Sequence, residues 1–240
     1  MSQLFGIKTI NVIVLTIDNK LCLYEHVGLT SHKDMFLMYK FSLLFILIFI
    51  SYLSSADDSN YNKVRDSVFW LKLYDENYET LYCGSKVSGG KRVTVEHVYP
   101  VIWIADSLGC KNHNECKLDK YINASSDLHN LWPALKKFES SRGNLPYGEI
   151  EGEKPRFETL VCDFERTTGK NAVVEPRDEV KGQIARSFLY MVHWYDLPTH
   201  DLLPLMVKWN YEYPPSQFEI DRQKLIEFYQ GRHNPFIKVN

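Results

Sequence analysis

The sequence predicts an α+β protein, because strand-like segments come early and long helical segments come last. Residues 78–83 and 92–99 show strand-like alternation of apolar side chains, and Gly89-Gly90 between them is typical of a turn. Three segments with helical spacing occupy the last third, at residues 178–195, 199–209 and 216–231. Since this part of the sequence has no repeat or low-complexity linker, we predict one folded domain over residues 57–240.

The composition supports a packed core and argues against disorder as the default. Of the 240 residues, 45% are apolar and 14% are aromatic. The chain has 28 basic and 30 acidic residues, so it lacks the strong positive charge of many duplex-binding proteins. Any surface that binds nucleic acid must therefore be a local patch.

An apolar run near the amino terminus predicts a signal peptide. Residues 41–50 are apolar except for one serine and follow Lys40, and Ser54-Ser55-Ala56 supplies the small residues that a signal peptidase accepts. A run of about ten to thirteen apolar residues is shorter than the ~20 that a membrane-spanning helix needs. We therefore predict that residues 1–56 are a leader with a signal peptide at about 35–56, cleaved near Ala56.

The 34 residues before Met35 leave the beginning of the chain open to two interpretations. Signal peptides normally begin a chain, so residues 1–34 are either an over-extended start or an unusual leader, and a start at Met35 or Met38 would give a conventional length. In the other interpretation these residues form a short strand and a linker, since Thr9–Thr16 is rich in β-branched residues.

The cysteines indicate disulfide bonds. Four of them lie after the leader, namely Cys83, Cys110, Cys116 and Cys162, whereas Cys22 lies within it. In an exported protein an even set of four permits two disulfides in three connectivities, of which we favour Cys110 with Cys116 and Cys83 with Cys162. A zinc site is the weaker interpretation, because the sequence has no Cys-x-x-Cys pair.

A helix and a strand are predicted at the start of the domain. Residues 61–74 have apolar positions at helical spacing. In the strand predicted at 92–99, Val93 and Val95 alternate with polar residues, and the segment then reaches Glu96-His97.

A loop and another helix follow this strand. Residues 107–126 are polar and show no clear period, which predicts a long loop that a disulfide would hold in place. The segment Asn130–Ala134 is expected to lead into a helix, with Pro133 in its first turn and its end near Arg142-Gly143.

The Glu-His pair suggests hydrolysis of a phosphodiester. That reaction needs a neutral imidazole that takes a proton from water and a divalent cation that stabilises charge on the phosphate and the departing oxygen. Neighbouring side chains of a regular strand point to opposite faces, so Glu96 and His97 can serve one site only at a strand end or a bulge.

The sequence resembles the bacterial endonuclease I family, which comprises periplasmic and secreted nucleases built on the ββα-metal (His-Me) finger. Six short strings carry the resemblance, in the order Tyr82-Cys83, Val95–Pro100, Ser126–Ala134, Arg142-Gly143-Asn144, Glu175–Arg177 with Lys181–Arg186, and Gln230–Phe236. Each string is weak by itself, but their shared order and approximate spacing extend over nearly the whole domain.

The resemblance implies a fold and residue roles. The fold would be a disulfide-stabilised α+β domain with a His-Me finger core and several additional helices. His97 matches the general base and Glu96 a magnesium ligand, while Asn130 matches a residue that orients the base or its strand.

Two positions depart from the family pattern. Glu139 stands where the family has an asparagine as its second metal ligand, and a carboxylate also suits a hard cation. The alternative role of Glu139 is a surface ion pair with Arg142, three residues further along the helix. His113 stands where the family often has an arginine for the phosphate, which leaves Arg142 and Arg186 as the other phosphate candidates.

Together these features predict a magnesium-dependent, non-specific endonuclease that acts on DNA, with RNA as a second candidate substrate. Calcium and zinc are the alternative metals. The enzyme would bind the phosphate backbone as a monomer, and it would be secreted or periplasmic, with no membrane association once mature. The alternative is a catalytically inactive, disulfide-stapled nucleic-acid-binding protein that retains the nuclease fold.

Overall fold

The computed structural model describes residues 12–17, 20–25, 60–152 and 162–238. The chain forms two compact units, residues 1–57 and 58–240, which are considered separately. The predicted signal peptide lies outside the described residues, so it stays a prediction.

The first unit contains an antiparallel hairpin. Its strands are β1 (Val12–Ile17) and β2 (Lys20–Glu25), paired from Val12 opposite Glu25 to Ile17 opposite Lys20. A strand in this region was the alternative interpretation of Thr9–Thr16, and the observed strand begins three residues later than that run.

The second unit opens with the helix predicted at residues 61–74. It starts as α2 (Asn60–Val64) and continues as η1 (Arg65–Leu73), whose turns have the wider π geometry. Phe69 and Trp70 of η1 are buried in a small aromatic cluster beside the main core.

A ββα unit follows in the middle of the chain. A short ribbon of β3 (Tyr78–Glu79) and β4 (Lys86–Val87) precedes it. Strand β5 (Thr94–His97) then pairs antiparallel with β6 (Leu131–Ala134), and α5 (Lys136–Arg142) comes directly after β6. The strand predicted at 92–99 is therefore confirmed. Of the strand predicted at 78–83, only the first two residues form a strand, which is β3.

The position of Pro133 was predicted wrongly. It lies within β6 opposite Val95, and the helix begins only at Lys136. The Pro133 carbonyl oxygen accepts a hydrogen bond of 2.8 Å from the Leu81 backbone N–H. A proline fits there because β5 and β6 form a sheet of two strands, in which each strand has an edge that needs no N–H donor.

The predicted loop at 107–126 is also shorter than expected. Helix α3 (Val101–Ser107) enters it and α4 (Asp119–Ser125) fills its second half, so only the middle is irregular. Tyr121 and Ala124 of α4 are buried in the main core. Burial of one short apolar face thus stabilises a helix that the polar composition concealed.

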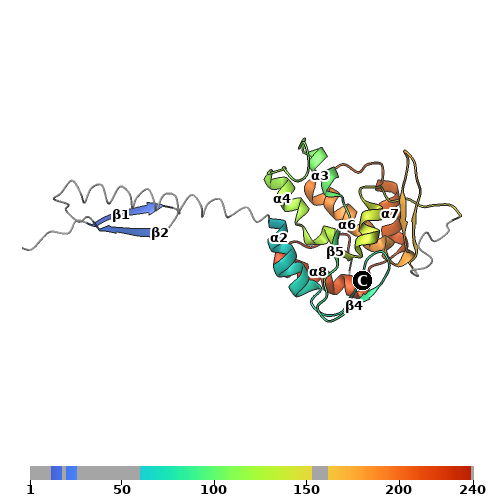
Figure 1. The fold of residues 1–240 in the computed structure, drawn as a ribbon, viewed down its shortest axis with the longest axis horizontal. Helices are drawn as coiled ribbons and strands as arrows, with labels where there is room; N and C mark the ends of the chain where they lie inside the picture. The colour runs from blue at the N-terminus through green and yellow to red at the C-terminus, as the bar shows by residue number, and fades with distance from the viewer. Residues whose placement is uncertain (1–11, 18–19, 26–59, 153–161, 239–240) are drawn as a thin grey trace, which may run out of the picture. The chain divides into compact units, whose positions relative to one another are not determined.

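The carboxyl-terminal helices agree with the prediction to within a few residues. They are α6 (Asp178–Tyr195), α7 (Leu203–Glu212) and α8 (Gln217–Gln230), preceded by the ribbon of β7 (Phe164–Arg166) and β8 (Val174–Pro176). Helix α6 is buried along most of its length, and α7 lies beside it (Figure 1). Within the described part of the chain, no helix has the length and apolar character needed to cross a membrane.

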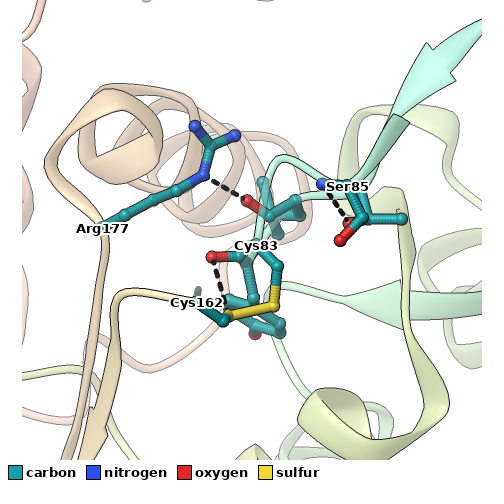
Figure 2. The surroundings of a disulfide bond; sticks show 7 residues. Cys83, Ser85, Cys162 and Arg177 are labelled. Atoms are coloured by element: carbon teal, nitrogen blue, oxygen red, sulfur yellow. Dashed lines mark hydrogen bonds between the residues drawn. A yellow bond between two sulfur atoms is a disulfide. The ribbon is translucent and has the colours of Figure 1, made fainter. Parts of the chain in front are cut away.

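Both favoured disulfides are confirmed. Cys110–Cys116 closes the irregular segment between α3 and α4, and Cys83–Cys162 joins the turn after β3 to the residues before β7. Figure 2 shows the second bond, with Arg177 donating from Nε to the Leu81 carbonyl oxygen at 3.1 Å beside it. The turn that contains Tyr82 is therefore held from two sides.

Candidate active site

The ββα unit brings most of the predicted site residues onto three adjoining elements. Strand β5 carries Glu96 and His97 at its end, Asn130 lies just before β6, and α5 carries Glu139 and Arg142. The element order is the one that the resemblance implies for a catalytic core.

The imidazole of His97 is fixed in one tautomer. His97 is half-buried, and its Nε2 lies 2.9 Å from the backbone carbonyl oxygen of Ser125. Because a carbonyl oxygen can only accept, Nε2 must carry the proton, and Nδ1 then has a free lone pair. Burial lowers the pKa of His97 to about 4, so the ring is neutral at neutral pH.

Glu96 lies on the buried side of β5. Its Oε1 accepts a hydrogen bond of 3.1 Å from Nη1 of Arg142, and both side chains are almost completely buried. Burial, together with the charge of Glu139, raises the pKa of Glu96 to about 7, against the opposing effects of Arg142 and a hydrogen bond from Tyr82. A cation close to this carboxylate would therefore be strongly favoured.

Arg142 is buried, and its described hydrogen bonds go to the protein. Besides Glu96, Nη1 donates to the His97 carbonyl oxygen at 3.1 Å, and Nη2 donates to the Val98 carbonyl oxygen at 2.7 Å. The guanidinium also lies over the ring of Tyr147, 4.8 Å from its centroid. The expectation that Arg142 contacts a phosphate is therefore corrected: it positions the end of β5 from within the core.

Asn130 makes the type of contact expected of a residue that orients the strand of the base. Its Oδ1 accepts from the Tyr99 N–H at 2.7 Å, and its Nδ2 donates to the Tyr99 carbonyl oxygen at 2.9 Å. This paired contact is completely buried and fixes the backbone two residues beyond His97.

Glu139 lies near the pair on β5. Its charge raises the pKa of both Glu96 and His97, and its side chain is 28% exposed. Glu139 is paired with Lys136 at 2.9 Å, whereas the alternative ion pair expected from the sequence has Arg142 as its partner.

Two carboxylates fit a magnesium ion better than a zinc ion. Among the described residues, no three His, Cys, Asp or Glu side chains lie close enough together to form a metal site. Zinc usually takes three or four protein ligands, whereas Mg²⁺ is commonly held by one or two carboxylates, with water and substrate phosphate completing its shell. Glu96 and Glu139 would supply two carboxylates of this kind, and the charge of Glu139 contributes to the raised pKa of Glu96.

Of the two weaker phosphate candidates, His113 stays a prediction, whereas the burial of Arg186 contradicts its proposed role. His113 lies in the disulfide-closed segment after α3, near enough for its charge to be among the causes that lower the pKa of His97. Arg186 is fully buried and forms two hydrogen bonds of 2.6 Å with Glu219. Its proposed phosphate contact is corrected for this reason, since the guanidinium is not presented to solvent.

Sequence reasoning missed three contacts of this site. The ring of Tyr61 on α2 lies 5.3 Å from that of His97, the Ser125 carbonyl orients the imidazole, and the hydroxyls of Tyr82 and Tyr147 meet at 3.0 Å beside Glu96. Tyr82 belongs to one of the strings that carry the resemblance, but a backbone carbonyl leaves no trace in a sequence.

Comparisons with known proteins show sequence similarity to nucleases. Residues 49–240 match the family described as Endonuclease I. An extracellular deoxyribonuclease of Aeromonas hydrophila is 30% identical over 196 residues, which cover 70% of this chain and 84% of that protein. A periplasmic deoxyribonuclease of the same organism is 27% identical over 226 residues, covering 82% and 93%.

A ribonuclease is also similar to part of the chain. The extracellular ribonuclease of Bacillus amyloliquefaciens is 30% identical over 154 residues, which cover 56% of this chain and 50% of the ribonuclease. The extracellular and periplasmic locations of these relatives, together with the two disulfides, support the predicted secreted or periplasmic location.

Proposed function

Because the chain belongs to the endonuclease I family, we propose that it is a secreted or periplasmic, magnesium-dependent endonuclease with His97 as its general base. One observation carries this role. The Nε2–H of His97 is held by the Ser125 carbonyl, which leaves Nδ1 as a basic lone pair on a ring that burial keeps neutral.

The base would act through a simple proton transfer. Nδ1 of His97 takes a proton from a water molecule that attacks the phosphorus in line with the departing oxygen. The Ser125 carbonyl stabilises the resulting imidazolium, because Nε2 continues to donate to it. Activity should therefore fall when acidification protonates the ring.

Glu96 and Glu139 would hold the metal. A bound Mg²⁺ would act as a Lewis acid that stabilises charge on the phosphate and on the departing 3′ oxygen, so that the products carry 5′-phosphates. The Arg142 guanidinium compensates part of the carboxylate charge, which helps the site accept an anionic substrate. The observed order of β5, β6 and α5, which carry these residues, supports their assignment to a ββα-metal (His-Me) finger.

The proposed substrate is DNA, bound through its phosphates without sequence specificity. The two Aeromonas hydrophila relatives described above are named deoxyribonucleases, while the ribonuclease relative, which matches 56% of this chain, keeps RNA as a second candidate. We propose that the enzyme acts as a monomer.

Plasmid nicking tests the proposal. The purified, oxidised protein should nick supercoiled plasmid in Mg²⁺, and EDTA should abolish the reaction. His97→Ala should lower kcat by roughly 10² to 10⁴ fold, the usual contribution of a general base. His193→Ala, which removes an exposed imidazole on α6, is the matched control and should leave the rate unchanged.

Two results would contradict the assignment. Nicking by His97→Ala at the wild-type rate would remove this residue from the mechanism. Binding of DNA by the wild-type protein without cleavage in Mg²⁺, Ca²⁺ or Zn²⁺ would identify the inactive nucleic-acid-binding protein instead.

A further inference from the structure

A cavity of about 340 Å³ lies beside the strand that carries the candidate base. We call it the flanking cavity. It is lined by side chains of α2 and η1 and by residues of the segment that enters β5, among them Tyr61, Arg65, Asp66, Arg92, Thr94 and Val95. None of these residues belongs to the strings that carry the family resemblance, apart from Val95.

Tyr61 connects the flanking cavity to His97. Its ring lies 5.3 Å from the imidazole of His97, and the Arg65 guanidinium carbon lies 5.6 Å from the centroid of the same ring. Since a strand rises about 3.3 Å per residue, Thr94 and Val95 lie about 7 to 10 Å along β5 from His97. This separation is short enough for a nucleic-acid strand that is bound at His97 to continue past the flanking cavity.

The flanking cavity presents two accessible arginines. Arg65 and Arg92 are 33% and 48% exposed, in contrast to the buried Arg142 and Arg186. Both approach the carboxylate of Asp66, with Nη2 of Arg65 at 2.8 Å and Nη1 of Arg92 at 3.6 Å. Two cations thus share one anion, and such exposed ion pairs contribute little stability, so another anion can compete with Asp66.

We propose that the flanking cavity binds the phosphodiester backbone of the cleaved strand beside the scissile bond. Arg65 and Arg92 contact its phosphates, since a planar guanidinium suits two phosphate oxygens at once. Tyr61 offers a ring edge to the adjoining nucleotide. Asp66 holds the two guanidinium groups together in the free enzyme and is displaced by substrate. This inference rests on the proposed nuclease function.

The helix geometry agrees with a binding role. Arg65 and Asp66 begin η1, whose π-type turns are rare in proteins and occur frequently at functional sites. Both residues line the cavity with partly exposed side chains, and the buried Trp70 of the same helix also lines it.

A charge-neutral double variant tests the inference in the full-length protein. Arg65→Gln with Arg92→Gln should raise KM for plasmid by roughly tenfold and leave kcat within about twofold, because phosphate contacts away from the reacting atoms supply binding rather than chemistry. In fluorescence anisotropy with a labelled duplex, the slope of log affinity against log salt should become shallower by about one to two.

Two further variants sharpen the test. Lys208→Gln with Lys224→Gln removes the same charge from exposed positions on α7 and α8, outside the flanking cavity, and should change neither KM nor the salt slope. Asp66→Asn frees both arginines and should lower KM, a change opposite in sign to the effect of partial unfolding.

The outcomes separate this inference from the proposed function. If the wild-type protein cleaves plasmid but the arginine variant keeps its KM and salt slope, the inference is overturned. Equal losses in the arginine and lysine variants would also overturn it, because net charge alone would then explain the effect. If the wild-type protein does not cleave, the proposed function fails, while duplex binding by the wild-type protein and the same three variants still decides the role of the cavity.

Discussion

At the scale of single residues, the buried ion pair of Glu96 and Arg142 links stability to the candidate chemistry. Arg142 holds the Glu96 carboxylate and two backbone carbonyls at the end of β5, so one side chain positions both the metal-ligand candidate and the base. Removing one partner leaves the other charge buried without compensation, which costs far more than an exposed ion pair contributes.

Arg142→Met should therefore destabilise the protein by about 3 to 5 kcal/mol, measured as a lower free energy of unfolding in urea. Glu96→Met with Arg142→Met should recover most of that loss, since neither charge then remains buried. The double variant should nevertheless be inactive in plasmid nicking. If the single variant unfolds at the wild-type urea concentration, the pair does not stabilise the end of β5.

The residues of the site differ in how far the sequence could identify them. His97, Glu96 and Asn130 lie in short strings of fixed order, so a local pattern was enough to single them out. Arg142 and Arg186 lie in equally distinctive strings, yet both are buried. Whether a guanidinium meets substrate or a buried carboxylate depends on which distant helix covers it, and Glu219, the partner of Arg186, is 33 residues away.

At the scale of elements, long periodic helices were predictable and short ones were not. Helix α6 was identified with its observed bounds, because many turns repeat the same apolar spacing. Helix α4 and strand β6 have only seven and four residues, so contacts with the rest of the fold decide their structure. The hydrogen bond from Leu81 to Pro133 is such a contact, made across a large separation in the chain.

The two disulfides should differ in their effect on stability. Cys83–Cys162 spans 79 positions and Cys110–Cys116 spans six. Closing the longer loop removes more entropy from the unfolded chain, so the model of loop closure gives roughly 4 to 5 kcal/mol for the first bond and roughly 2 kcal/mol for the second.

Replacing each pair of cysteines by serine and measuring urea unfolding would check this order. The Cys83→Ser and Cys162→Ser variant should lose more stability than the Cys110→Ser and Cys116→Ser variant. The reverse order would mean that the irregular segment between α3 and α4, which carries His113, contributes more to the folded state than its length indicates.

At the scale of the whole molecule, every candidate site residue lies in the second compact unit. That unit spans residues 58–240, and the family match begins at residue 49. The protein as a whole has a formal net charge of −2, so binding of a polyanion must depend on local groups rather than on overall charge.

Residues 57–240, purified under oxidising conditions, should therefore nick plasmid with the kcat and KM of the full-length chain. The reason is that the two units are separately compact and only the second contains the candidate centre. Kinetic assays of both proteins at equal concentration would check this. A lower kcat for the shorter protein would show that the amino-terminal unit takes part in catalysis.

The bond between Cys83 and Cys162 has a consequence for the cell that makes this protein. Thiols stay reduced in the cytosol, so a newly synthesised chain would lack the bond that ties the Tyr82 turn beside Glu96. Its cutting centre would be completed only outside that compartment. The producing cell could then spare its own chromosome through redox chemistry, without needing a dedicated inhibitor.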